Sequence, residues 1–234
     1  PNKVVSWVYN SNTAKQHRDI AFYGVKPIFS QVKQPYKNPT DKRIAKRIAE
    51  GKGARLYDWW NINQVKNVSK KEIDHPCVMP NNVMENIIGI LPKNITTIID
   101  PFMGSGTTLV EAKVNGCHSY GLDTNPMALK IAKAKTLKLT TENLNEIDDF
   151  ILRLTNVKNN FKISNNLSNI ELFPGSGLWF RNDVSQKLNC VMKMVRDYSP
   201  EVQNFLDVGY SNLLKGMSNA RMDSVTPVLP EAPI

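Results

Sequence analysis

The sequence predicts an α/β fold, for three reasons. Residues 76–136 read as helix, strand, turn, helix, strand and helix, an order that contains a βαβ unit. Residues 3–9 and 19–25 are rich in β-branched and aromatic residues and predict strands. The pattern from about residue 140 onward is helical. We therefore expect a sheet with helices, followed by a helical C-terminal region.

A polar loop over residues 10–18 is expected to join the two N-terminal strands. Residues 31–74 are mostly irregular and predict a long insertion ahead of the βαβ unit. One short helix is expected in it over residues 40–51, with Thr40 as the N-cap. Long loops in compact domains are often functional, so the insertion is a candidate interaction surface.

The composition is that of a globular protein, with 41% hydrophobic and 22% charged residues among 234. The apolar runs are far shorter than the roughly 20 residues that a membrane-spanning helix needs, so we expect a soluble, cytoplasmic protein. Three cysteines and three histidines without ligand spacing predict a reducing compartment and no metal. Without a signal-like segment or an initiator Met, we expect a processed product or a chain that begins inside a gene.

The positive charge is concentrated in the insertion. The chain carries a net charge of +9, and residues 31–74 hold eleven Lys or Arg against five acids, a net of +6. Aromatic residues are interleaved with these cations, as surfaces that track phosphates and stack on bases require. A solvated basic face with its aromatics in the core remains an equal alternative. The candidate DNA-binding residues are Lys42, Arg43, Lys46, Arg47, Trp59 and Trp60, and which Trp is exposed stays open.

Residues 98–126, IIDPFMGSGTTLVEAKVNGCHSYGLDTNP, hold the most organised chemistry. A strand ending at Asp100 leads through a Gly104–Gly106 turn into a helix, whose first N–H groups face a ligand. The next strand ends at Asp123, where an acid can accept both hydroxyls of a ribose. The pattern is neither G-x-G-x-x-G nor a P-loop, so a nucleoside without polyphosphate is expected. S-adenosylmethionine fits; an ordinary glycine-rich βα turn with two capping acids is the alternative.

The stretch DPFMGSGTT closely resembles the cofactor motif of DNA amino-methyltransferases, and HPCVMPNNVMENII is similar to the segment preceding it. The resemblance covers residues 3–136 and implies a Rossmann-like class I methyltransferase sheet with helices on both faces. It implies a cofactor-binding core over 1–137, with 138–234 as a helical region. The S-adenosylmethionine contacts that it implies are Asp100, Pro101, Phe102, Gly104, Ser105, Gly106, Thr107 and Asp123, and also His75, Pro76 and Pro80.

The chain departs from that family in one respect. The family's catalytic motif is Asp, Asn or Ser followed by Pro-Pro and an aromatic, and no such tetrapeptide occurs here. The nearest stretch is Gln34-Pro35-Tyr36. Towards the end, GLWFRNDV and FLDVGYSNLLKGMSNARMD are similar to a second group of DNA methyltransferases, whose motif follows the Ser-Asn-Ala-Arg stretch. The catalytic residues are therefore unassigned, and we expect a fragment or a split subunit completed by a second polypeptide.

The expected function is methylation of adenine N6 or cytosine N4 in double-stranded DNA, on a flipped base, in a restriction-modification system. Two alternatives remain. The chain is a non-catalytic DNA-binding or specificity partner that retains a methyltransferase fold, or it belongs to an RNA methyltransferase.

Overall fold

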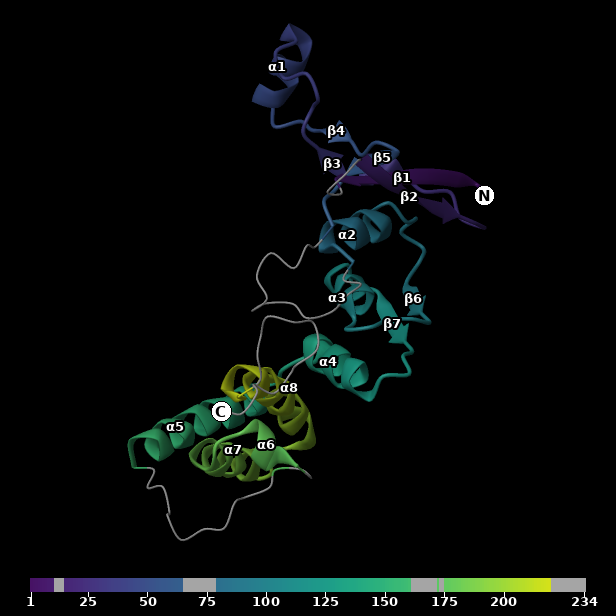
Figure 1. Ribbon diagram of the computed structural model, residues 1–234. Coiled ribbons are helices and arrows are strands. Elements are labelled where there is room, and N and C mark those ends of the chain that lie inside the picture. Colours follow the sequence, from purple (N-terminus) through teal and green to yellow (C-terminus); the bar gives the residue numbers. More distant parts are fainter. Residues whose placement is uncertain (11–14, 65–78, 161–171, 173–174, 220–234) are drawn as a thin grey trace, which may run out of the picture. The chain divides into compact units, whose positions relative to one another are not determined.

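The computed structural model describes residues 1–10, 15–64, 79–160, 172 and 175–219. The chain divides into two compact units, Pro1–Asp123 and Thr124–Ile234, and Figure 1 shows the elements of each. The first unit is mixed α/β and the second is helical in its described residues. The expected domain boundary after residue 137 remains a prediction.

The N-terminal strands form an antiparallel pair. Strand β1 covers Lys3–Asn10, β2 covers Lys15–Phe22, and β5 (Trp59–Asn61) pairs parallel with β1, so the sheet order is β2-β1-β5. Both expected strands are present, but the second ends at Phe22 and not at residue 25. The expected loop over 10–18 was wrong at both ends, because Asn10 belongs to β1 and residues 15–18 belong to β2. The Arg18 guanidinium lies 5.7 and 5.8 Å from the ring centroids of Trp7 and Tyr9, and this packing holds a polar segment against β1.

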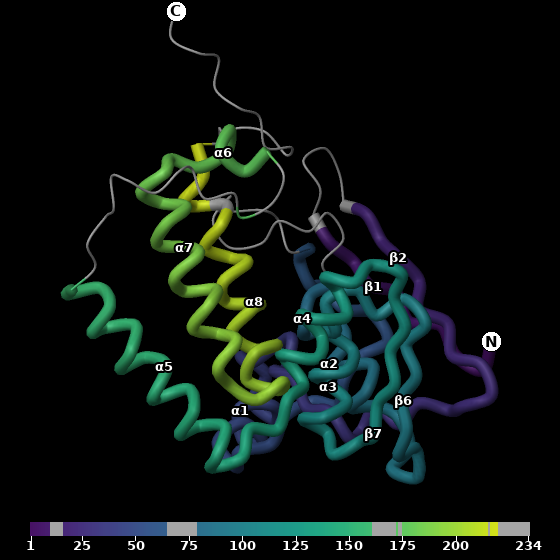
Figure 2. The backbone as a smooth tube through the Cα atoms, turned by 90° about the horizontal axis from the view of Figure 1, so that it is seen from below, coloured from purple at the N-terminus to yellow at the C-terminus, as the bar shows by residue number. Residues whose placement is uncertain are grey.

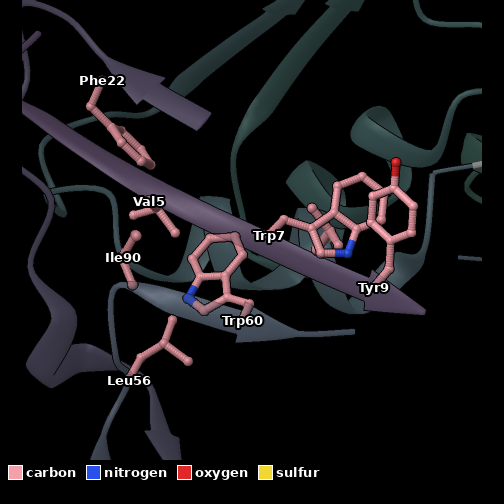
Figure 3. Packing of buried hydrophobic residues seen from close by; sticks show 8 residues of the cluster. Val5, Trp7, Tyr9, Phe22, Leu56, Trp60 and Ile90 are labelled. Atoms are coloured by element: carbon pink, nitrogen blue, oxygen red, sulfur yellow. The ribbon is translucent and has the colours of Figure 1, made fainter. Parts of the chain in front are cut away.

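A hydrophobic core lies along one face of this sheet (Figure 3). Helix α2 (Asn81–Gly89) supplies Val83 to it, as expected for a helix packed on a sheet. The buried indole of Trp7 donates to the Ile62 carbonyl at 2.6 Å, so its polar edge is satisfied. The labelled core residues are Val5, Trp7, Tyr9, Phe22, Leu56, Trp60 and Ile90.

The insertion is more ordered than expected. A 3-10 turn (Phe29–Gln31) leads into it, and it holds the antiparallel strands β3 (Lys33–Gln34) and β4 (Ala54–Arg55), with helix α1 (Lys42–Ala49) between these strands. Asp41 is the N-cap of α1, not Thr40, because its carboxylate accepts the N–H groups of the first turn. Helix α1 has no buried residue.

The βαβ unit is confirmed. Strands β6 (Thr97–Asp100) and β7 (His118–Gly121) are parallel and joined by α3 (Thr107–Val114), which packs against α2. The described residues therefore form a mixed α/β fold with three small sheets. One Rossmann-like sheet with helices on both faces remains a prediction.

The second unit contains α4 (Pro126–Thr136), α5 (Thr141–Asn160), α6 (Ser176–Trp179), α7 (Asn182–Val195) and α8 (Pro200–Met217). Helices α5, α7 and α8 lie side by side, as Figure 2 shows, around Phe150, Met194 and Val195. The expected helical C-terminal region is confirmed for its described part. Among the residues that the structure describes in both units, no helix is both long and apolar enough to span a bilayer.

Candidate functional site

The glycine turn lies at the carboxyl ends of two parallel strands. Asp100 ends β6 and pairs in register with Gly121 of β7. The Leu122 N–H donates to the Asp100 carbonyl at 2.9 Å, and the Met103 N–H donates to the Leu122 carbonyl at 3.0 Å. These backbone bonds hold the turn between the two strand ends, which is where ligands bind in parallel α/β sheets.

The two predicted acids each accept a hydrogen bond from this turn. The Asp100 Oδ1 accepts the Phe102 N–H at 3.0 Å, and the Asp123 Oδ2 accepts the Gly104 N–H at 2.9 Å. Asp123 therefore joins the end of the second strand to the turn that follows the first. The structure brings Asp100, Gly104 and Asp123 together, as the pattern of strand ends predicts.

The backbone conformation explains both glycines of the turn. Gly104 has φ 51° and Gly106, the N-cap residue of α3, has φ 84°. Both lie in the left-handed region, where side chains are disfavoured. A Cβ at Gly104 would meet no atom within 4 Å, so the turn borders open space on that side. A ligand can approach the backbone there.

Gly121 contributes to the site although the motif did not predict it. A Cβ at Gly121 would clash with the Met103 Sδ and with the Leu109 Cδ1. Met103 and Leu109 are buried beneath the turn and fix its position over the strands. The only sequence signal was a glycine inside a strand-like segment, which indicates a close approach.

The other predicted cofactor contacts are placed unequally. Pro101 and Phe102 are exposed at the turn, Phe102 to 88%, and Ser105 and Thr107 are half-buried at the start of α3. Pro80 is buried at the N-terminus of α2, on the helix that packs against α3. His75 and Pro76 lie outside the described residues.

The basic insertion is a second candidate site. Helix α1 presents Lys42, Arg43, Lys46 and Arg47, and all four are exposed. Strand β5 separates the two tryptophans, because neighbouring side chains point to opposite faces of a strand. Trp59 is 42% exposed, whereas Trp60 is 3% exposed and lies in the core shown in Figure 3. Trp60 is therefore no longer a candidate DNA contact, because packed side chains cover its indole.

An ion pair joins β1 to the residue that precedes β5. The Lys3 Nζ lies 2.7 Å from the Asp58 Oδ2, and this hydrogen bond lowers the pKa of the Asp58 carboxyl from its usual value. Both side chains are substantially exposed, so the pair contributes little to stability. It keeps Asp58 charged and held by Lys3 beside the exposed aromatic residues.

The Gln34-Pro35-Tyr36 stretch is held by strand pairing. The Gln34 Nε2 donates to the Arg55 carbonyl at 3.1 Å, and β3 pairs with β4. The Gln34 side-chain amide therefore already donates to a backbone carbonyl within the insertion. Across the part of the chain that the structure describes, no group of three His, Cys, Asp or Glu side chains could hold a metal ion.

With this geometry established, the comparisons identify the family. The N6/N4 DNA methylase model matches residues 2–134, which is more than half of the chain, and the chain belongs to this DNA methylase family. That range includes β6, the glycine turn, β7 and the described part of the insertion.

The chain is similar to several curated methyltransferases. It is 29% identical over 173 residues to the Type II methyltransferase M.MvaI of Kocuria varians, covering 66% of this chain and 37% of that protein. It is 38% identical over 92 residues to the Type II methyltransferase M2.LlaDCHI of Lactococcus lactis subsp. cremoris, covering 39% of this chain and 34% of the relative. The chain thus spans about a third of the length of these relatives. Among solved structures, the crystal structure of M1.HpyAVI is similar at 17% identity and a TM-score of 0.35, over 58% of this chain and 60% of that one.

Proposed function

We propose that this chain provides the cofactor-binding and DNA-recognition parts of a restriction-modification DNA methyltransferase that uses S-adenosylmethionine to methylate adenine N6 or cytosine N4. The observation that carries the proposal is the hydrogen bond from the Gly104 N–H to the Asp123 carboxylate. This bond joins the end of β7 to the glycine turn that follows β6, so both strand ends contribute to one site. Membership of the DNA methylase family supports the same interpretation.

The residues at this site fit the proposed cofactor. Open space beside Gly104 leaves room for close approach to the backbone, and the exposed Phe102 and Leu122 offer an apolar surface to a flat adenine. Asp123 places a carboxylate at the second strand end, and the oxygens of a carboxylate can each accept more than one hydrogen bond, including those from ribose hydroxyls. Helix α3 begins directly after the turn, and the unpaired N–H groups of a helix N-terminus favour electronegative groups of a ligand. When bound, S-adenosylmethionine would supply a methyl group on a positively charged sulfur.

The DNA-binding half of the proposal depends on the insertion. The four exposed cations of α1 neutralise phosphates without reading sequence, which is the ordinary source of affinity for DNA. Trp59 is the exposed aromatic residue in the described part of the insertion, and its ring can contact bases. The catalytic motif is assigned to no residue of this sequence, so methyl transfer itself requires a segment or subunit that carries it.

Calorimetry with S-adenosylhomocysteine, the demethylated cofactor, tests the proposed site. Asp123→Ala should weaken binding by roughly 1.5 to 3 kcal/mol, because the ribose hydroxyls lose their acceptor. Asp123 also holds the turn, so Asp123→Asn is the matched variant. Its amide oxygen can still accept the Gly104 N–H, and it should lose less affinity than Asp123→Ala. Wild-type affinity in both variants would place the ribose elsewhere.

A further inference from the structure

Three side chains of the insertion form a cluster on its exposed surface. The rings of Tyr57 and Trp59 are nearly parallel, with an interplanar angle of 11° and centroids 6.4 Å apart. The Lys37 Nζ lies 3.6 Å from the Trp59 centroid and 4.8 Å from the Tyr57 centroid. The ammonium group therefore covers the ring faces of an aromatic pair that is only half-buried or exposed.

The aromatic pair is held by the β1–β5 pairing and by a hydrogen bond to the buried core. Trp59 pairs with Ser6 across the parallel β1–β5 ladder. The buried Trp60 donates its indole N–H to the Tyr57 carbonyl at 2.9 Å, which ties the preceding residues to the core. Trp59 and Tyr57 thus present their rings from a fixed backbone, at small entropic cost on binding.

Further cations lie next to Tyr57, one of the two rings. Tyr57 also lines a cavity of about 300 Å³ together with Lys3, Lys26 and Arg55. Asp58 is the acid in this lining, and it is paired with Lys3. Three cations against one carboxylate leave the cavity net positive. An anion the size of a phosphate is the chemical group that suits it.

We propose that this cluster binds one unpaired nucleotide of a DNA strand, with the base stacked on Trp59 and its phosphate at the Lys3–Lys26–Arg55 cavity. The inference rests on the proposed function, because it deepens the DNA-recognition role. Lys37 covers the rings in the free protein and moves to a phosphate when a base takes its place. A base inside a regular duplex is stacked on its neighbours and cannot offer its face, so the site selects an unpaired base.

Binding of a short oligodeoxythymidine tests this assignment. In the wild type, stacking should quench the fluorescence of Trp59, measured as the difference from Trp59→Phe. Trp59→Ala should weaken binding roughly five- to 150-fold, the range found for loss of one stacked base. Trp59→Phe keeps a ring face and should retain most of the affinity. Equal affinity in Trp59→Ala and the wild type would overturn the assignment.

Tyr23→Ala is the matched control, because Tyr23 is a 70% exposed aromatic residue of the same unit outside the cluster. It should leave oligonucleotide affinity unchanged, and a loss equal to that of Trp59→Ala would overturn the assignment. Oligouridine should bind more weakly than oligodeoxythymidine; the reverse order would overturn the choice of DNA. Duplex DNA and S-adenosylhomocysteine binding, measured on the same variants, report on the proposed function separately. If duplex DNA and S-adenosylhomocysteine still bind while Trp59→Ala leaves oligodeoxythymidine affinity unchanged, the stacking site is wrong and the proposed function stands.

Discussion

Gly104 and Gly116 lie before and after α3 and have the same type of backbone conformation. Both adopt left-handed conformations, with φ 51° and 72°, and a Cβ at either would meet no atom within 4 Å. Alanine at either position should therefore cost a similar roughly 1 to 2 kcal/mol of stability. Only at Gly104 does the added methyl enter the space that we assign to the cofactor. Gly104→Ala should lose S-adenosylhomocysteine affinity in calorimetry, while Gly116→Ala keeps it.

An equal loss in both variants would attribute the effect to stability and would support the alternative of an ordinary βα turn. Gly121 shows why part of this site could not be predicted. The motif names residues that face the ligand, whereas Gly121 acts on the opposite side by leaving room for Met103 and Leu109. That requirement depends on which side chains pack under the turn, and spacing alone does not contain it.

The cations of helix α1 can be removed without disturbing its packing. None of its residues is buried, and alanine is a better helix former than the residues it would replace. Replacing Lys42, Arg43, Lys46 and Arg47 by Ala should therefore leave the helix intact. It should weaken binding to duplex DNA of any sequence and flatten the salt dependence by about 0.9 for each phosphate that the helix no longer neutralises. A salt titration of DNA affinity measures both effects.

The control removes four exposed lysines of the second unit, Lys133, Lys138, Lys187 and Lys193. It lowers the net charge equally, so it should change the salt slope less than the α1 variant. Equal slopes for the wild type and the α1 variant would mean that the insertion is only a solvated basic face, as the alternative interpretation of the charge pattern holds.

The packing of α2 on α3 brings two acids together. Burial raises the pKa of Glu111 above its ordinary value of 4.5, and the charge of Glu85 raises it further. The folded state therefore binds this proton more tightly than the unfolded state, so the carboxyl favours folding at low pH and this advantage is lost as the pH rises through the folded pKa. Glu85→Gln should stabilise the protein near neutral pH by less than about 1 kcal/mol.

Denaturant unfolding at neutral pH and near pH 4 checks this sign. The gain should shrink in acid, where Glu111 takes up its proton, and it should vanish in a Glu111→Gln background if the two carboxylates interact directly. A gain that persists at both pH values would point to helix propensity or solvation instead.

The elements themselves were predictable to different degrees. The βαβ unit follows from its strands, glycine turn and helix, because all of these signals are local. The start of β2 was not predictable, since residues 15–18 are polar and only their pairing with β1 and the rings under Arg18 make them a strand. Likewise, two adjacent tryptophans carry no signal of which one faces the core. That choice depends on the register between β5 and β1.

The absence of the family's catalytic motif from this sequence affects its expected activity. The sequence contains no tetrapeptide of Asp, Asn or Ser followed by Pro-Pro and an aromatic to localise the lone pair of a target amine. We therefore expect this chain alone to bind cofactor and DNA without transferring a labelled methyl group to DNA. Robust transfer would contradict this and would make Gln34-Pro35-Tyr36 the first segment to mutate. Transfer to RNA would instead favour the RNA methyltransferase alternative.

We expect the glycine turn and Asp123 to bind the nucleoside of S-adenosylmethionine. The most direct measurement is an NMR titration of the isotope-labelled chain with S-adenosylhomocysteine, following every backbone amide. The claim predicts that the largest shifts occur at Gly104, Ser105, Gly106 and Asp123, with small shifts in the helices of the second unit. Saturable binding with its largest shifts outside residues 100–123, or no binding at all, would contradict it.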